Sequence, residues 1–265
     1  MSFIKPELLL AMDARKYEVT KRIANESLTI EDVLAGLQGI IEGIYPIRPA
    51  YPLPYQLVAP HRQIQRATEF LALCGGEVST WSIPEVPHFV PRTSTELLLL
   101  AIYLPDEGEL TGEQHTAKSW WDFIVPPIGF SKKLLHPLYS DFTQLRLVSG
   151  IEHRPGIRWV VFDPSANLGK SPKVCWEDPN VLPTLAGPEV LMALAYFPEW
   201  VSTWADDCSP QPDLSGYQAN SGSKWDYCPC FMRWDKGHEL QLLALNAADG
   251  STNWASPSVR DLSTE

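Results

Sequence analysis

The carboxyl-terminal end of the chain has the clearest alternation of apolar and polar segments. Three apolar runs, at 228–234, 239–245 and 252–256, are separated by Asp235-Lys-Gly237 and Asp249-Gly250. Asp-Gly between two apolar runs is typical of a tight hairpin, because glycine accepts the positive φ that such turns require. The pattern predicts an antiparallel meander of three strands that uses its tryptophans and cysteines as core filling.

A second hairpin is predicted upstream of the meander. Leu145 and Leu147 alternate with polar residues, and an apolar run follows at 157–163. Pro155-Gly156 stands between the two segments and suits the central positions of a type II turn. We therefore expect these segments to pair with each other.

The remaining elements are predicted from helical spacing and from the residues that end each run. Apolar residues recur every three or four positions in several segments, which indicates amphipathic helices. A short apolar run at 97–104, bounded by Pro105, indicates a buried strand, and the Pro-, Ser- and Gly-rich segment 206–223 indicates a surface loop. The predicted helices cover residues 6–23, 29–44, 61–74, 116–125 and 190–196.

The order of these elements predicts an α+β fold, with N-terminal helices and an antiparallel sheet of two hairpins or a meander in the C-terminal half. We expect one domain over residues 1–265, with a helical subregion at 1–55 as the alternative. The proline-rich segment 45–55 favours polyproline II. It is either a stiff linker or, through Pro46-x-x-Pro49, a motif for a partner's aromatic groove.

Composition narrows the class of protein. The chain has 265 residues, is 45% hydrophobic and carries a formal net charge of −11. This apolar content argues against disorder, and the negative charge argues against nucleic-acid partners. The start of the chain lacks a secretory signal, and no apolar run is long enough for a membrane span. Five cysteines, an odd and sparse set, favour a reducing compartment. We expect a soluble, acidic, cytoplasmic protein without a nucleic-acid or membrane partner.

One constellation has the side chains of a metal site. Cys228 and Cys230, with Cys208 and His238, offer four soft ligands. Zinc sites usually pair cysteines two to four residues apart. A one-residue gap in a strand puts both thiols on one face about 7 Å apart, so chelation needs a bulge at Pro229. The favoured interpretation is two buried thiols that act as small apolar side chains, with no metal and no cofactor.

Other motifs indicate little chemistry. Gly169-Lys170-Ser171 resembles the end of a phosphate-binding loop, but Pro164 occupies the position of the required first glycine and Pro172 follows where a helix should begin. His153 lies in the predicted Pro-Gly turn, where an exposed histidine is expected. His115 and His136 lack a serine or cysteine partner at a recognisable spacing.

Several strings in the second half resemble a family of hypothetical proteins of small-genome bacteria. The resemblance implies a bacterial origin but no activity, cofactor or site residue. The strings are Leu185-Ala-Gly-Pro-Glu-Val-Leu-Met-Ala-Leu-Ala, Phe197-Pro-Glu-Trp-Val, Gly216-Tyr-Gln, Arg233-Trp-Asp, Trp254-Ala-Ser-Pro and Gly150-Ile-Glu-His-Arg-Pro-Gly-Ile-Arg-Trp.

Two functions remain open. The first is a non-enzymatic protein that binds a protein partner or a small ligand, since catalytic motifs are absent from the sequence and tryptophan and proline are abundant. The alternative is a hydrolase or metal-dependent enzyme with a site near Cys208, Cys228, Cys230 and His238. The tryptophans of the last third are core or interface residues, with core favoured for most. They are Trp200, Trp204, Trp225, Trp234 and Trp254.

Overall fold

The computed structural model describes residues 60–262, with gaps at 94, 128, 136–141, 205–210, 222–223, 235–237 and 251–253. All of these residues lie within the unit Arg48–Glu265. The helices expected at 6–23 and 29–44 and the proline-rich segment 45–55 lie outside the described residues. A single domain over 1–265 therefore stays a prediction.

The described chain has an α+β fold, as predicted, with its antiparallel strands concentrated in the C-terminal half. One sheet has the order β1-β4-β10 and is antiparallel, and a larger one has the order β2-β8-β7-β6-β3. The short strands β5 and β9 form a parallel pair, and β2 joins β8 in parallel. The strands are β1 (Leu97–Tyr103), β2 (Ser131–Leu134), β3 (Leu145–Leu147), β4 (Gly156–Asp163), β5 (Gln211–Pro212), β6 (Tyr217–Ser221), β7 (Lys224–Trp234), β8 (Glu239–Asn246), β9 (Trp254–Ala255) and β10 (Ser258–Asp261).

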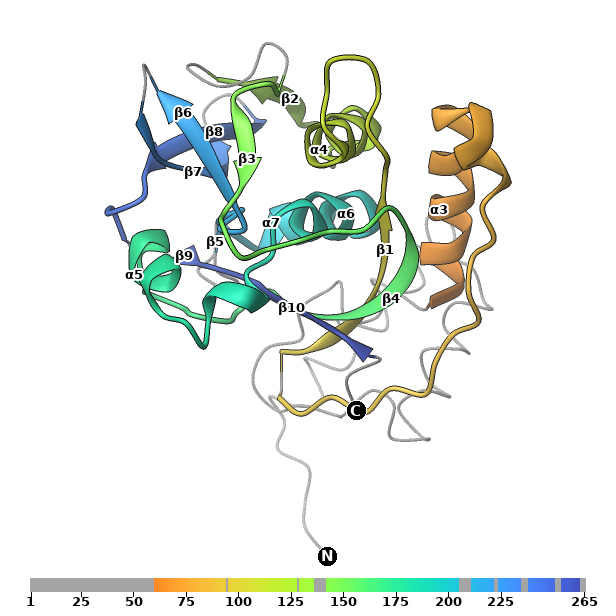
Figure 1. Ribbon diagram of the computed structural model, residues 1–265, viewed down its shortest axis with the longest axis horizontal. Helices are drawn as coiled ribbons and strands as arrows, with labels where there is room; N and C mark the ends of the chain where they lie inside the picture. Colours follow the sequence, from red (N-terminus) through yellow and green to blue (C-terminus); the bar gives the residue numbers. More distant parts are fainter. Residues whose placement is uncertain are drawn as a thin grey trace, which may run out of the picture. The chain divides into compact units, whose positions relative to one another are not determined.

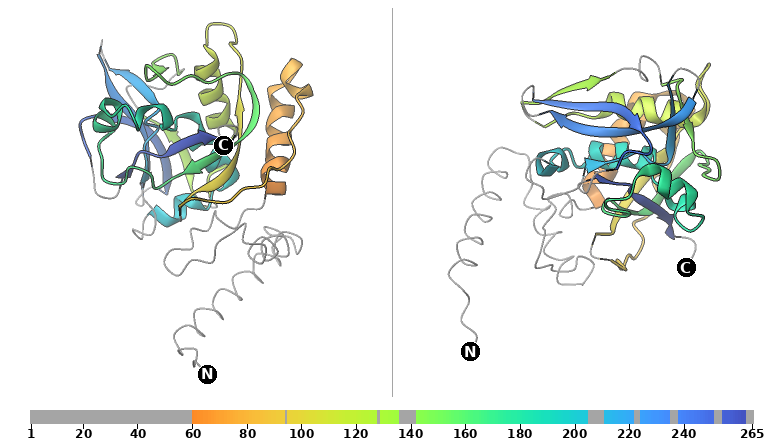
Figure 2. Two further views of the ribbon diagram at one scale, coloured as in Figure 1. Left: turned by 60° about the horizontal axis from the view of Figure 1, so that its bottom comes forward. Right: turned by 90° about the vertical axis from the view of Figure 1, so that its left-hand side faces the viewer.

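A wholly buried helix, α6, occupies the centre of the fold. All nine of its residues are buried, and Figure 1 places it beside β1 and α4. Helix α3 and the five-stranded sheet lie on opposite sides of α6 and β1 (Figures 1 and 2). None of the described helices has the length and apolar character of a membrane span. The helices are α3 (Pro60–Cys74), η2 (Gly76–Thr80), α4 (Gly112–Phe123), α5 (Pro172–Glu177), η3 (Leu182–Thr184), α6 (Pro188–Tyr196) and α7 (Trp200–Thr203).

Helix α3 confirms the helix predicted at 61–74. Its apolar stripe is buried, and Phe70 stacks on Trp120 of α4 with ring centroids 3.8 Å apart. Gly75 and Gly76 end it with φ of 68° and 56°, the left-handed conformation that glycine adopts without steric cost. The stacked pair joins α3 and α4 in the core.

Helix α4 begins four residues before the predicted start. Thr111 and Gln114 form a capping box, in which each side chain satisfies a backbone N–H of the first turn. The Trp120 indole then donates to the carbonyl of Ile102 at 3.1 Å, so that the polar end of a buried ring is satisfied.

The hairpin predicted between 145–147 and 157–163 is wrong, although both strands exist. Strand β3 pairs with β6, whereas β4 lies between β1 and β10 in the other sheet. Residues 159–162 are all buried, which suits a central strand covered on both faces. The Pro155-Gly156 turn signal therefore does not show that the central strand β4 pairs with β3, which is an edge strand of the other sheet.

The C-terminal meander is correct for two of its three strands. Strands β7 and β8 form an antiparallel hairpin from the pair Tyr227–Asn246 to the pair Trp234–Glu239. The third run was assigned the wrong partner, since β9 pairs in parallel with β5 and β10 joins β4. The backbone near Asp249-Gly250 packs instead against Ser171, which lies 3.3 Å from the position of an added Gly250 Cβ.

The surface loop predicted at 206–223 is also wrong over its second half. Residues 212–217 are buried, and β6 follows directly. Gly216 makes this possible, because an added Cβ would lie 2.8 Å from the nitrogen of Gly187. Close approach of two backbones, rather than turn formation, explains this glycine.

Candidate functional site

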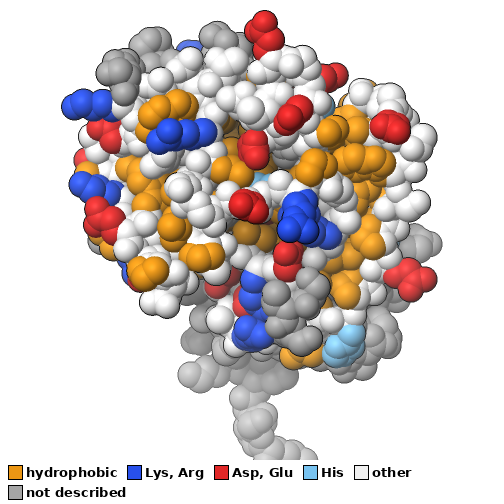
Figure 3. All heavy atoms as spheres, in the orientation of Figure 1, with side chains coloured by type: hydrophobic (Ala, Val, Ile, Leu, Met, Phe, Trp, Pro, Cys, Tyr) orange, Lys and Arg blue, Asp and Glu red, His pale blue; other side chains and the backbone are white. Residues whose placement is uncertain are grey.

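A cavity of about 340 Å³ opens between η3, the strand β10 and the segment that joins β3 to β4. A second hollow of about 410 Å³ lies against the same segment and shares Ile151, Glu152 and His153 with the first. Acidic and basic side chains gather near the centre of the face in Figure 3. The first cavity contains the polar groups described below.

Glu189, in the first turn of α6, is completely buried at the base of this cavity. Its Oε1 accepts a hydrogen bond from the Tyr103 hydroxyl at 2.5 Å and lies 3.2 Å from Nε2 of His153. Its Oε2 accepts from the backbone N–H of Gly187 at 2.8 Å. Three donors from three segments therefore surround one carboxylate, which is what a buried anion requires.

The surroundings of Glu189 determine its ionisation. Burial by itself would raise the pKa of Glu189. The charge of His153, together with hydrogen bonds from His153 and Tyr103, outweighs burial and lowers the pKa to about 2. The pKa of Tyr103 is raised well above its usual value, first by burial and then by the negative charge of Glu189. At neutral pH the carboxyl group is ionised and the phenol keeps its proton.

His153 contradicts the prediction of an exposed turn histidine. Its side chain is only 8% exposed, and its ring lies 4.6 Å from that of Tyr103. Nε2 faces Glu189, but Nδ1 is buried without a hydrogen-bond partner among the described residues. Because buried polar atoms are almost always hydrogen-bonded, an unsatisfied nitrogen in a residue that lines a cavity is a candidate contact for a ligand.

Arg158 of β4 provides a second incompletely satisfied group in the same cavity. Its guanidinium lies 4.1 Å above the Tyr103 ring, and Nη1 donates to the carbonyl of Arg154 at 3.0 Å. Its Nε is 3.3 Å from Oδ1 of Asp261 but lacks a hydrogen bond of acceptable geometry. The ion pair with Asp261 holds the side chain in place, but the Nε–H has no well-aligned acceptor.

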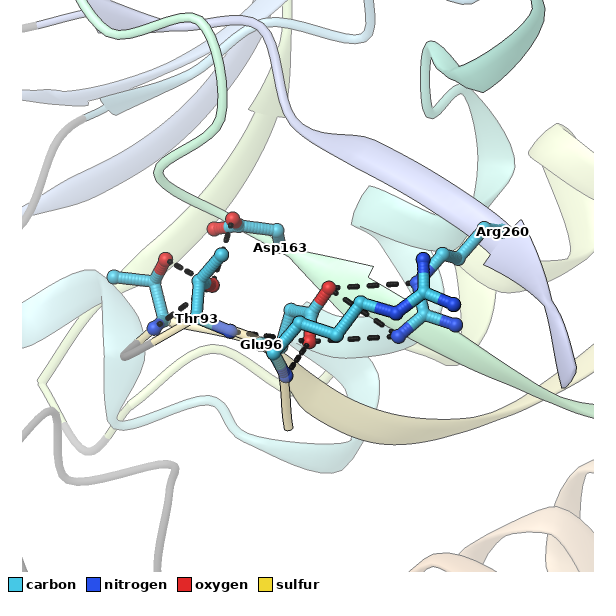
Figure 4. A network of polar contacts seen from close by, with 6 residues as sticks. Thr93, Glu96, Asp163 and Arg260 are labelled. Atoms are coloured by element: carbon cyan, nitrogen blue, oxygen red, sulfur yellow. Dashed lines mark hydrogen bonds and ion pairs between the residues drawn. The ribbon is translucent and has the colours of Figure 1, made fainter. Parts of the chain in front are cut away.

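The rim of the cavity on β10 is held by a polar network (Figure 4). Arg260 contacts Glu96 with Nη2 and Oε1 3.4 Å apart, and the Glu96 side chain is only 9% exposed. Thr93 donates to Asp163 at 3.4 Å at the end of β4. The network joins the start of β1 to β4 and β10, and thus fixes the strand that carries Arg260 beside the cavity.

The candidate metal ligands lie in different environments. Cys228 and Cys230 are buried in β7, whereas His238 is exposed in the turn before β8, with φ of 47°. Cys208 lies outside the described residues. Over the part of the chain that the structure describes, no three His, Cys, Asp or Glu side chains are arranged to hold a metal ion. The four-ligand site, considered as the alternative to buried apolar thiols, stays a hypothesis.

The two thiols of β7 are poor nucleophiles and poor ligands in this environment. Burial, followed by the nearby Asp213 carboxyl, raises the pKa of Cys228 and of Cys230 well above its usual value. Burial also raises the pKa of Cys74 to about 11. Only the thiolate reacts or binds metal readily, so the raised pKa values of Cys228 and Cys230 support their interpretation as small apolar side chains of the core.

We expect Cys228 and Cys230 to resist iodoacetamide in the native protein at pH 8, because they are buried and protonated. A Cys208→Ser variant removes the cysteine outside the described residues, and mass spectrometry then measures the alkylation of each remaining thiol. Unfolding in guanidinium should make both cysteines react fully. Alkylation of either one within minutes in the folded protein would contradict their assignment to the core.

Asp213 is a buried polar residue that sequence reasoning missed. It is 1% exposed, and neither carboxylate oxygen has a hydrogen-bond partner within the described chain. The hydroxyls of Ser215 and Ser256 are likewise buried without partners. Burial raises the pKa of Asp213 well above its usual value, so that the carboxyl favours its neutral form.

The Gly169-Lys170-Ser171 segment does precede a helix, contrary to prediction. Helix α5 begins at Pro172, where proline is favoured because its missing N–H needs no partner. The backbone N–H of Gly169 donates to the carbonyl of Trp254 at 2.8 Å, and that of Lys170 donates to Asn167 at 3.1 Å. These N–H groups are used within the fold, and Pro164 still replaces the first glycine of the motif.

Comparisons of the chain with protein-family models, with curated proteins and with solved structures found no match. The resemblance to hypothetical bacterial proteins therefore stays a prediction.

Proposed function

We propose that this protein binds a small polar ligand in the cavity beside His153 and acts as a binding protein. One observation carries the proposal: His153 lines the cavity, and its buried Nδ1 has no hydrogen-bond partner in the described chain. A ligand that hydrogen-bonds to Nδ1 would satisfy it. Leaving such a group unsatisfied costs about 1–3 kcal/mol, which is returned when the ligand binds.

The cavity is organised before any ligand arrives. Glu189 is fixed by Tyr103 and by the backbone of Gly187, and it in turn orients the imidazole of His153. The volume of about 340 Å³ lies at the small end of the range for ligand pockets. A site whose polar groups are already oriented loses little conformational entropy on binding.

The Glu189–His153 pair also supports a second candidate, an enzyme that uses His153 in acid–base catalysis. A carboxylate that holds one imidazole nitrogen and leaves the other open is the usual arrangement of a general base. The hydrolase considered from the sequence would then use His153 in place of Cys228 and Cys230. Turnover of a bound ligand, measured by NMR over hours, separates this candidate from simple binding.

We propose the cytoplasm of a bacterium as the location of the protein. Cys74, Cys175, Cys228 and Cys230 are free thiols, which supports a reducing compartment. The acidic net charge of −11 supports solubility, and the resemblance of the second half supports a bacterial origin.

An NMR fragment screen tests the binding proposal. We expect some fragments to shift the imidazole signals of His153 saturably, and His153→Asn to weaken their binding at least tenfold. His88→Asn, which changes an exposed histidine, is the matched control and should change nothing. Backbone amide spectra check that each variant is folded. The proposal fails if no fragment shifts His153, or if binding to folded His153→Asn is as tight as to the wild type.

A further inference from the structure

We infer that the ligand of this cavity is an anion, a small molecule whose carboxylate or phosphate group binds between His153 and Arg158. The inference rests on the proposed function and specifies its ligand class. The atoms that lack hydrogen-bond partners at this cavity are side-chain nitrogens. His153 and Arg158 line the same cavity, and Nδ1 of His153 and Nε of Arg158 are buried without a hydrogen-bond partner in the described chain, although Nε lies 3.3 Å from Oδ1 of Asp261.

Both groups can donate hydrogen bonds to an anion. Arginine remains protonated and has no acceptor atom, so its Nε can only donate. Nε2 of His153 lies 3.2 Å from the fully buried, ionised carboxylate of Glu189, whose oxygens only accept, so Nε2 carries a hydrogen. An anionic group at Nδ1 would favour the imidazolium form, in which Nδ1 also donates. Two donors at one cavity require a ligand with two acceptors, as carboxylate and phosphate have.

The acidic groups at the cavity do not satisfy these donors. The oxygens of Glu189 are occupied by Tyr103, Gly187 and His153. Asp261 is half exposed and contacts Arg158 without a proper hydrogen bond, and Glu152 is exposed to solvent. Exposed carboxylates are screened by water, so they oppose an incoming anion only weakly.

The other lining residues and the volume of the cavity limit the polarity and size of the rest of the ligand. Ile151, Leu185 and Val259 contribute apolar wall, and Arg260 adds a further positive charge on β10. With about 340 Å³ available, a single ring or a short chain fits beside the anionic group. The ligand class is therefore a small organic anion with a compact apolar part.

Four probes that share a phenyl ring and differ in their polar group test the inference: benzoate, phenyl phosphate, benzamide and benzylamine. NMR titrations follow the His153 imidazole and the Arg158 Nε–H. We expect benzoate, phenyl phosphate or both to shift both signals and to bind at least tenfold more tightly than benzamide and benzylamine. Comparison of the two anions identifies the preferred head group.

Arg158→Gln should weaken the anions at least tenfold, because it removes one donor. Arg154→Gln, which removes an exposed neighbouring charge but no donor in the cavity, should change binding less than twofold. Tighter binding of benzamide or benzylamine, or no shift from any probe while screened fragments still bind at His153, would overturn the anion inference alone. A cavity that binds neither probes nor fragments would overturn the proposed function as well.

Discussion

Glu189→Ala is expected to lower the free energy of unfolding by about 3–5 kcal/mol at pH 7, because it leaves the buried His153 ring and the Gly187 N–H without the carboxylate that they face. The substitution also removes the acceptor for the Tyr103 hydroxyl. Urea denaturation followed by tryptophan fluorescence measures the change. Glu69→Ala is the control, since Glu69 is a half-exposed carboxylate paired with Arg66 on α3 and should contribute no more than about 1 kcal/mol.

The effect of Glu189→Ala should depend on pH in a defined direction. The folded-state pKa of Glu189 is lowered from 4.5 to about 2, so its stabilising contribution is complete above pH 4.5 and is lost as the pH falls toward 2. The difference between wild type and variant should therefore shrink across that window. A variant as stable as the wild type at pH 7 would show that the carboxylate is not the buried partner of His153.

Asp213→Asn is expected to stabilise the protein by about 1–3 kcal/mol at pH 7, because asparagine keeps the shape of aspartate without a charge to bury. The folded-state pKa of Asp213 is raised, so the wild type loses stability as the pH rises from 3.8 toward that value. Asparagine does not titrate, and the advantage of the variant should vanish near pH 3.

Thermal unfolding at pH 3 and pH 7 measures this effect. Asp122→Asn, which removes an exposed carboxylate paired with Lys118, is the control and should change stability by less than about 1 kcal/mol. If Asp213→Asn were less stable than the wild type at pH 7, the carboxyl would have to be ionised and held by a positive group, and its assignment as a buried neutral acid would be wrong.

Elements with strong local signals could be predicted from the sequence. Helices α3 and α6 and strand β1 were predicted nearly to the residue, since each combines a clear apolar pattern with glycine or proline at an end. The β7–β8 hairpin was predicted for the same reason. Capping at Thr111 was missed, and so α4 starts earlier than expected.

Pairings between distant strands could not be predicted. Strand β4 pairs with β1, more than fifty residues earlier, and with β10, near the end of the described chain. A strand that is buried on both faces, such as β4, is expected to lie between two other strands. The sequence does not specify which strands these are. The segment 206–223 was misjudged because Gly216 serves close packing and was interpreted as a loop residue.

The candidate site was missed for a related reason. His153 and Glu189 are 36 residues apart, and Tyr103 lies still further away, so no spacing in the sequence links them. A glutamate just after Gly187-Pro188 is also what a helix start requires. The only available signal was a histidine-containing string, residues 150–159, within the resemblance to hypothetical proteins.

The burial expected for the tryptophans of the last third is confirmed for some of them. Trp200 and Trp204 are buried, as expected for core residues, and their rings lie 5.6 Å apart. Trp225 and Trp254 are partly exposed, and the Arg146 guanidinium lies 4.2 Å over the ring of Trp225. The side chain of Trp234 lies outside the described residues, and the interface role considered for the exposed tryptophans stays a prediction.

A double-mutant cycle with Glu189→Ala and His153→Ala tests most directly whether these two side chains form the buried pair at the base of the cavity. Free energies of unfolding are measured at pH 7 for the wild type, both single variants and the double variant. A coupling energy of about 1–3 kcal/mol is predicted, because each residue loses its buried polar partner when the other is removed. Additive effects, within about 0.5 kcal/mol, would contradict the pair and the site built on it.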